Sequence, residues 1–223
     1  MRQTRIALLA LAVPAVLGCA GARASAQQPP ASAAPDSALA AADTASGTAA
    51  AVPAGFGTLR QDDVAFKFQI GGKQVKILPL DEGVIRTLSP DSYRALRNLQ
   101  ESKMAQVNEF ARRNGAPGYS LWYVQFYGLE PDARFSPRDL TITSGGREYR
   151  PIEVLPLSAG FGQERLRQRE VQHAVYLFEN TVNVDQPLVV TVEGQPSTSW
   201  TETLRRIERE RALIRSRTSR TKG

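Results

Sequence analysis

The run Ser120-Leu121-Trp122-Tyr123-Val124-Gln125-Phe126-Tyr127 decides the fold of this 223-residue chain. Most of its residues are β-branched or aromatic, which is typical of a strand. Successive side chains of a strand point to opposite faces. One face would carry Trp122, Val124 and Phe126. The other would carry Leu121, Tyr123, Gln125 and Tyr127. Because both faces carry bulk, we predict a central strand that is covered on both sides.

The aromatic rings of this run also allow a second interpretation, a ligand platform. Trp122, Tyr123 and Tyr127 would then form a binding surface, because Tyr and Trp rings combine an apolar body with a polar tip. The apolar pattern on both faces favours the core over the platform.

Further strands flank this run on both sides. Residues 64–70 alternate apolar and polar positions, and Gly71-Gly72 joins them to residues 73–78, which is the pattern of a hairpin. Gly71-Gly72 lacks the helix start and the Lys-Ser/Thr of a phosphate-binding loop. A second hairpin joins residues 139–143 to residues 148–155 around Gly145-Gly146, with Pro137 and Pro151 limiting its pairing. Two more strands are expected over residues 174–178 and 188–192, separated by residues 183–187. Residues 158–172, before the first of these strands, are expected to form a long loop or a short helix.

A helix is expected over residues 90–114, between the second and third strands. Ser89 is placed as the N-cap and Pro90 at the first helical position. Arg112 and Arg113 suit the negative end of the helix, and Gly115 the C-cap. At 1.5 Å per residue the helix would be about 37 Å long. Its apolar stripe is more simply docked on a sheet than offered to a cofactor.

These elements predict a mainly β fold: an antiparallel immunoglobulin-like β-sandwich of about seven strands, over residues 58–196, with the helix 90–114 inserted. From Trp122 to Gly194 the order of elements resembles the immunoglobulin-like accessory domains of bacterial lipoproteins and secreted proteins. The resemblance rests on Val124-Gln125-Phe126-Tyr127, the Gly145-Gly146 hairpin and the two later strands. It implies a binding or assembly module and carries no catalytic residues.

The N-terminus has the layout of a secretory signal. A basic flank with Arg2 and Arg5 precedes the apolar run 6–17, which is too short to span a bilayer. Val16-Leu17-Gly18-Cys19 resembles the lipobox of bacterial lipoproteins, with Leu17 larger than usual; the signal would be residues 1–18 and Cys19 the lipidated residue. Ala24-Ser25-Ala26 offers the alternative of cleavage after residue 26. The lone Cys favours the lipobox, since it has no disulfide partner.

Both cleavage sites place the mature protein outside the cytoplasm. We expect an outer-membrane or cell-envelope lipoprotein that faces the periplasm or the surface; the alternative is a soluble periplasmic or secreted protein. Residues 19–57 are rich in Ala, Pro, Ser and Thr, and Phe56 is their only aromatic residue. Such a composition favours a disordered tether.

A basic helix and tail, residues 197–223, end the chain. Trp200–Gly223 contains eight basic and three acidic residues, and so carries most of the net charge of +6. Trp200, Leu204, Ile207 and Ile214 fall on one stripe, with Arg211 its polar exception. The helix could simply pack by this stripe, with a solvated basic face. Alternatively, the basic face would contact anionic lipid head groups through Arg205, Arg206, Arg209, Arg215 and Arg217. Export and the neutral charge of residues 59–199 argue against nucleic acid as a partner.

No constellation for catalysis stands out. The single His and single Cys exclude zinc sites built from several His or Cys, and His173 has no visible catalytic partner. Adjacent acids, Asp62-Asp63 and Asp81-Glu82, are expected to be solvated turn residues, and calcium-loop spacing is absent. We therefore assign no catalytic residue, metal site or cofactor. The sequence favours a non-enzymatic binding or envelope-assembly module, with an envelope protein as a further expected partner. The alternative is an exported hydrolase whose carboxylates are not paired in sequence.

Overall fold

The structure is a computed structural model that describes residues 52–221. The predicted signal peptide, both cleavage sites, Cys19 and most of the tether lie outside these residues. Residues 52–57, which the sequence places in the tether, contact the fold. Val52 is buried, and a Cβ atom on Gly57 would lie 2.1 Å from the carbonyl oxygen of Thr87.

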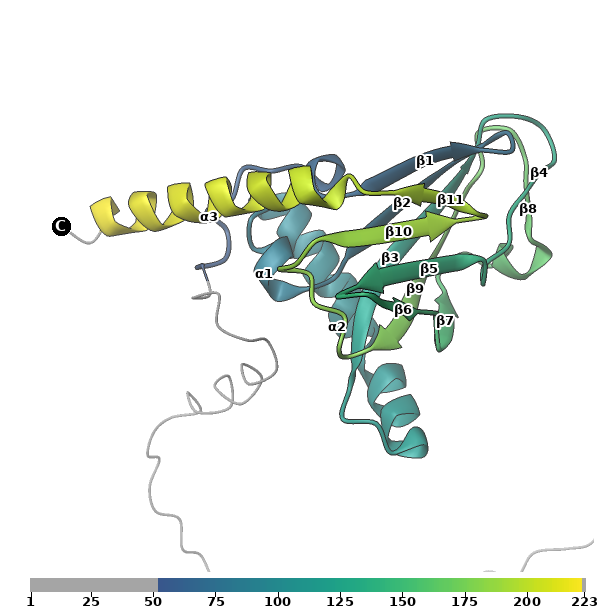
Figure 1. The fold of residues 1–223 in the computed structure, drawn as a ribbon, viewed down its shortest axis with the longest axis horizontal. Coiled ribbons are helices and arrows are strands. Elements are labelled where there is room, and N and C mark those ends of the chain that lie inside the picture. Colours follow the sequence, from purple (N-terminus) through teal and green to yellow (C-terminus); the bar gives the residue numbers. More distant parts are fainter. Residues whose placement is uncertain (1–51, 222–223) are drawn as a thin grey trace, which may run out of the picture. The chain divides into compact units, whose positions relative to one another are not determined.

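The larger sheet has five antiparallel strands and contains the central run of the sequence. Its order is β1 (Phe66–Ile70), β2 (Lys73–Pro79), β3 (Tyr119–Gly128), β9 (Val171–Glu179) and β7 (Glu153–Pro156) (Figure 1). The predicted hairpin joins β1 to β2, and both glycines of its turn have positive φ, 53° at Gly71 and 72° at Gly72. Glycine adopts this conformation without the steric penalty of a Cβ atom.

The smaller sheet has four antiparallel strands, in the order β11 (Gln195–Ser197), β10 (Leu188–Val192), β5 (Leu140–Ser144) and β6 (Arg147–Tyr149). A separate pair joins β4 (Ala133–Arg134) to β8 (Arg165–Leu166). The larger and the smaller sheet contribute buried side chains to one hydrophobic cluster, such as Val124 and Phe126 from the larger sheet and Ile142 and Val190 from the smaller one. The described part of the chain is therefore mostly antiparallel sheet around a shared core.

The second predicted hairpin needs a correction at Pro151. Residues 148–155 do not form one strand, because β6 stays in the smaller sheet while β7 joins the larger one. Pro151 has no N–H to donate to a sheet and lies between the two strands. Pairing with β9 begins directly after it, where the Ile152 amide donates to the carbonyl of Leu177. The chain thus crosses between sheets at this proline.

The central strand β3 is confirmed as a middle strand, paired with β2 on one side and β9 on the other. Trp122, Val124 and Phe126 are buried on the face toward the core. Trp122 has no exposed surface, so its assignment to a binding surface was wrong. On the opposite face Tyr123 and Tyr127 are half-buried. That face is covered over only part of its length.

The predicted helix is present as α2 (Pro90–Asn114), ending at Gly115 with φ 61°. The Ser89 hydroxyl hydrogen bonds with the hydroxyl of Ser92 instead of capping the backbone. Leu96, Val107 and Ala111 are the buried residues of α2. The Phe110 ring contacts Tyr119, whose side chain is on the same face of β3 as Tyr123. The helix α2 therefore docks on the outer face of the larger sheet.

The C-terminal helix α3 (Trp200–Thr221) packs by its apolar stripe, as the sequence predicts. Trp200, Ile207 and Ile214 are fully buried. Its C-terminal half extends beyond the strands (Figure 1).

Three short helices and several short strands were not predicted. The helices are η1 (Gln61–Asp63), α1 (Glu82–Ile85) and η2 (Phe161–Gln163). The described chain has eleven strands, compared with about seven in the prediction. Three of the additional strands, β4, β8 and β11, are too short to show a hydrophobic period, and the fourth arises because the predicted strand 148–155 is divided into β6 and β7. Residues 158–172, expected as a loop or helix, supply η2, β8 and the start of β9.

Candidate functional site

The outer face of the larger sheet carries three rows of side chains that cross β2, β3 and β9 at increasing distance from α2. The strand register sets each row. The apolar row, next to α2, is Leu78, Tyr123 and Val175. The middle row is Lys76, Gln125 and His173. The third row is Gln74, Tyr127 and Val171. Exposure therefore rises with distance from α2, from the buried Leu78 and Val175 to the exposed Gln74 and Val171. This is the pattern expected where a helix covers only one end of a sheet.

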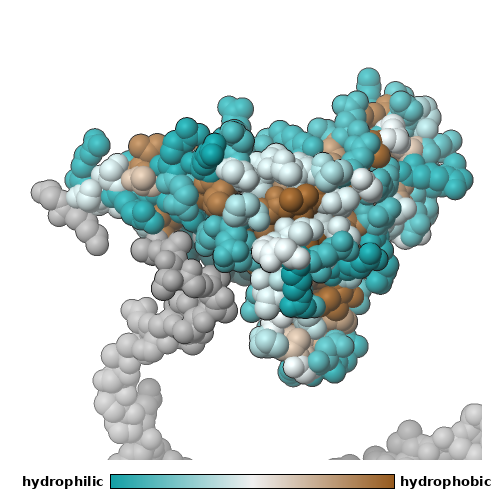
Figure 2. Space-filling model, viewed as in Figure 1, coloured by the Kyte–Doolittle hydropathy of each residue, from teal (hydrophilic) through white to brown (hydrophobic). Residues whose placement is uncertain are grey.

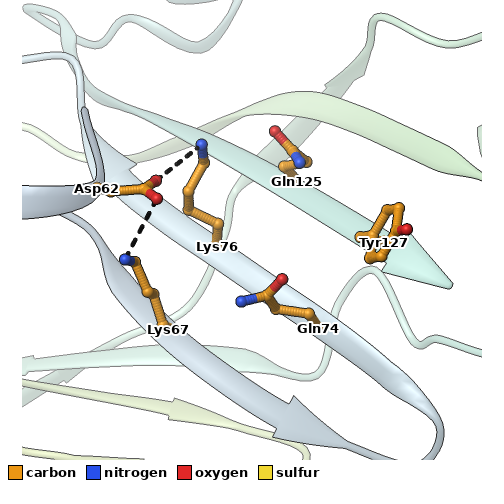
Figure 3. A pocket seen from close by; sticks show the side chains of 6 residues that line it. All are labelled: Asp62, Lys67, Gln74, Lys76, Gln125 and Tyr127. Carbon is orange, nitrogen blue, oxygen red and sulfur yellow. Dashed lines mark hydrogen bonds and ion pairs between the residues drawn. The ribbon is translucent and has the colours of Figure 1, made fainter. Parts of the chain in front are cut away.

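A hollow of about 180 Å³ lies over the middle and third rows, and we call it the outer-face hollow (Figure 3). Its lining comes from η1, β1, β2 and β3: Asp62, Lys67, Gln74, Lys76, Gln125 and Tyr127. Ligand pockets for drug-sized molecules are typically about 300–1,000 Å³. The outer-face hollow therefore suits one small polar unit, or one unit of a longer ligand lying across the sheet.

Asp62 holds the two lysines of the hollow together. Lys67 and Lys76 are directly opposite each other in the β1–β2 register, which places like charges side by side. The two oxygens of Asp62 each lie 3.3 Å from one lysine nitrogen. Burial alone would raise the pKa of Asp62, but the charge and hydrogen bond of Lys76, followed by those of Lys67, hold it below its ordinary value. The hollow therefore carries an ionised carboxylate and two cations, a net charge of +1.

The uncharged side chains of the hollow keep unused hydrogen-bonding capacity. The Tyr123 hydroxyl, next to the hollow, donates to Oε1 of Gln125 at 3.2 Å. Burial raises the pKa of Tyr123, so it remains a neutral donor. This bond leaves the Gln125 amide N–H groups available. Within residues 52–221, the side chains of Gln74 and Tyr127 have no hydrogen-bond partner. Three neighbouring groups can therefore bind a polar ligand.

His173 ends the middle row but does not line the hollow. Its ring lies 6.0 Å from the ring of Tyr123, and its Nδ1 atom is buried without a hydrogen-bond partner among the described residues. Burial lowers the pKa of His173, which keeps the ring neutral. The nearby Glu170 instead accepts bonds from the Arg167 amide and the Gln172 side chain. Among residues 52–221, no carboxylate pairs with His173 in the way that orients a catalytic base.

The adjacent acids are engaged in structural contacts. Asp63 accepts a hydrogen bond from the Arg60 amide at 2.8 Å. Glu82 forms ion pairs with Arg86 and Arg97. Asp81 was expected to be solvated; burial, and next the charge of Asp185, raise its pKa instead. In the part of the chain that the structure describes, no three His, Cys, Asp or Glu side chains form a group that could hold a metal ion.

The five arginines predicted to contact lipid do not share one environment. Arg206 donates to the Asp63 carbonyl at 2.8 Å, and Arg217 donates to the Phe56 carbonyl at 2.8 Å and to Glu210 at 3.0 Å. Arg205 is exposed, 3.7 Å from Glu202. Arg209 and Arg215 are exposed and have no ion-pair partner within residues 52–221. At least Arg206 and Arg217 therefore help to hold α3 against the fold.

Of the residues in the hollow, only Tyr127 was a predicted site residue. The alternation of apolar and polar residues in the sequence also indicates some of the other lining residues. Lys67 and Gln74 are polar positions of the alternating patterns on either side of Gly71-Gly72. The contribution of Asp62 depends on η1, which no pattern predicted.

None of the helices within residues 52–221 combines the length and apolar character that a bilayer crossing requires. Comparisons with protein families, curated proteins and solved structures found no match to this chain.

Proposed function

We propose that this chain is an exported, lipid-anchored, non-enzymatic module that binds a hydroxyl-rich glycan of the cell envelope at the outer-face hollow. The observation that carries the proposal is the unused donor and acceptor capacity of Gln74, Gln125 and Tyr127 on an open sheet face. Amide side chains both donate and accept hydrogen bonds, as sugar hydroxyls do. The Tyr127 ring adds an apolar surface beside them.

The charges of the hollow favour a glycan that also carries carboxylates. Lys67 and Lys76 present ammonium donors, and Asp62 offsets only one of the two charges. Hydrogen bonds between an ammonium group and a carboxylate are stronger than neutral ones. An acidic glycan would therefore bind more tightly than a neutral glycan of the same size, and its binding would weaken with added salt.

The immunoglobulin-like relationship and the envelope location are parts of the same proposal. The immunoglobulin-like relationship is supported by two antiparallel sheets around one core. The N-terminal sequence, with Cys19 in a lipobox-like setting, supports the envelope location. A lipid anchor would hold the module next to its ligand in the envelope. The local concentration of the ligand would then be high, so that a site of low affinity could still be occupied.

The alternative, an exported hydrolase, has less support. Asp62 is the only carboxylate that lines the hollow, and Lys67 and Lys76 keep it ionised. Glycoside hydrolysis generally needs a second carboxyl group across the scissile bond. A module that binds without cleaving fits this lining better.

The test is co-sedimentation of the chain with purified peptidoglycan, an insoluble glycan that carries carboxylates. The variants are Gln74→Ala and Tyr127→Ala, and the control is Thr143→Ala on the smaller sheet. We expect both hollow variants to lose most of the binding and the control to keep it. Equal binding by all three variants would reject the site. Release of soluble fragments during the incubation would favour the hydrolase.

A further inference from the structure

Two acids near the middle of α3, Glu208 and Glu210, are paired with other groups of the described chain. Glu208 pairs with the buried Arg211 at 2.6 Å. Glu210 is 4% exposed and accepts hydrogen bonds from the amide and hydroxyl of Thr58, each at 3.0 Å. Glu210 thus helps to hold α3 against the fold, whereas Glu208 is paired within the helix. Within residues 52–221, neither acid forms an ion pair with Arg209 or Arg220.

That outward face combines cations with an exposed apolar side chain. Residues 209, 213, 216 and 220 follow one another at helical spacings of four, three and four, so they share a side of α3. Arg209 and Arg220 are exposed and have no acidic partner within residues 52–221. Leu213 lies between them and is 49% exposed. Arg215 is exposed as well but is not on this stripe.

A second exposed apolar side chain belongs to a residue whose backbone contacts α3. Arg217, one turn after Leu213, donates to the backbone carbonyl of Phe56 at 2.8 Å. The Phe56 side chain is 43% exposed. Phe56 and Leu213 are two of the most exposed large hydrophobic residues in the described chain. Apolar residues appear among hydrophilic ones along α3 in Figure 2.

The chain enters the fold beside this stripe. Phe56 lies near the start of the described residues, and thirty-two residues separate Cys19 from Val52. Any attachment of the N-terminal segment to a membrane would therefore be connected to the fold next to α3. This connection and the uncompensated positive charge point to the same partner, a lipid surface with negative head groups.

We infer that Phe56, Arg209, Leu213 and Arg220 form a membrane-contact surface that docks on anionic phospholipid. The arginines bind the head groups, and the two apolar side chains enter the boundary between head groups and acyl chains. This inference goes beyond the glycan-binding proposal and does not depend on it, since the outer-face hollow and the membrane-contact surface have no residue in common.

The experiment uses the full chain with Cys19→Ser, so that no lipid anchor contributes. Co-sedimentation is measured with vesicles of phosphatidylcholine alone and with phosphatidylcholine mixed with phosphatidylglycerol. We expect binding only to the mixed vesicles, and weaker binding at high salt. Arg209→Gln with Arg220→Gln should lower the partition constant about 30-fold, which corresponds to about 1 kcal/mol for each arginine. The matched control, Arg112→Gln with Arg134→Gln, removes two exposed arginines elsewhere and should have little effect.

A second pair of variants separates lipid from other polyanions. Phe56→Ser with Leu213→Ser should weaken vesicle binding and leave binding to heparin unchanged, because both side chains are exposed and carry no charge. Unfolding curves that match the parent chain would show that both pairs fold. Equal binding to neutral and anionic vesicles would overturn the inference. The inference would also be overturned if the matched control lost as much vesicle binding as the Arg209→Gln with Arg220→Gln variant. It would be overturned as well if Phe56→Ser with Leu213→Ser lowered the affinity for heparin.

Discussion

The indole ring of Trp200 stacks on the ring of Phe66, with centroids 5.3 Å apart and planes inclined by 14°. The indole nitrogen donates to the Val184 carbonyl at 2.8 Å. The first residue of α3 thereby contacts the first residue of β1 and the loop before β10. This side chain is therefore one of the contacts that join α3 to the N-terminal part of the folded region.

We predict that Trp200→Ala lowers the free energy of unfolding by about 3–5 kcal/mol, because it removes a fully buried aromatic side chain and leaves a cavity. Urea unfolding followed by circular dichroism measures the change. Trp200→Phe keeps the stacking and loses the hydrogen bond, so it should be clearly milder. A chain that ends at Ser199 should not fold cooperatively; a normal unfolding transition from it would show that α3 is dispensable.

The ion pair of Lys73 and Glu193 ties the β1–β2 hairpin to the turn between β10 and β11. The Lys73 nitrogen lies 2.8 Å from the carboxylate, and only 1% of Lys73 is exposed. We predict that Glu193→Gln destabilises the fold by about 3 kcal/mol, since it leaves a buried ammonium group without its counter-charge. Lys73→Met combined with Glu193→Gln should be less destabilising than the sum of the single changes. Additive effects in chemical denaturation would contradict the coupling.

The pKa of Asp81 predicts a pH effect on stability. Burial, and next the charge of Asp185, raise this pKa, against the opposing influence of the Gly83 and Val84 amides and of Arg211. The native state therefore favours the protonated acid. Stability should fall as the pH rises from the ordinary aspartate pKa, about 3.9, through the raised value in the fold. Asp81→Asn removes this loss, so its stability relative to the parent should increase from acidic to neutral pH. Urea unfolding over a pH series tests the sign, and a constant difference would reject it.

The lipidation of Cys19 has its own test. Cells that express the parent chain should incorporate labelled palmitate into it and retain it in the membrane fraction. Cys19→Ser should lose the label. Cleavage after residue 26 instead of before Cys19 would give an unlabelled chain with Gln27 at its N-terminus. N-terminal sequencing of the mature protein distinguishes the two outcomes.

Sequence patterns predicted an element correctly where interactions between neighbouring residues determine it. The helix 90–114 was predicted to the residue, because Pro90 and Gly115 fix its ends through backbone conformation. The core face of β3 followed from its alternation. The separation of β6 from β7 was not predictable in the same way: Pro151 showed that pairing would be interrupted, but the sheet that each strand joins depends on the distant β9.

The same distinction applies to the candidate site. Tyr127 could be selected from the sequence, but its neighbours depend on the register between β2 and β3. Trp122 was a candidate for a binding surface as well as for the core, because an aromatic ring suits both. Its complete burial agrees with the core, the interpretation that the sequence favoured. Arg211 looked like an exception in an apolar stripe. Its position is explained by Asp185, at 2.9 Å, and by the carbonyl of Gly83, both far away in sequence.

The crossing at Pro151 has a mechanical consequence. Because β6 and β7 flank one proline yet belong to different sheets, a pull on either sheet is transmitted directly to the other through the backbone. While this short connection stays intact, β6 and β7 can move apart only by the length of the three residues between them. A domain built in this way should resist stretching up to a threshold and then give way in a single step.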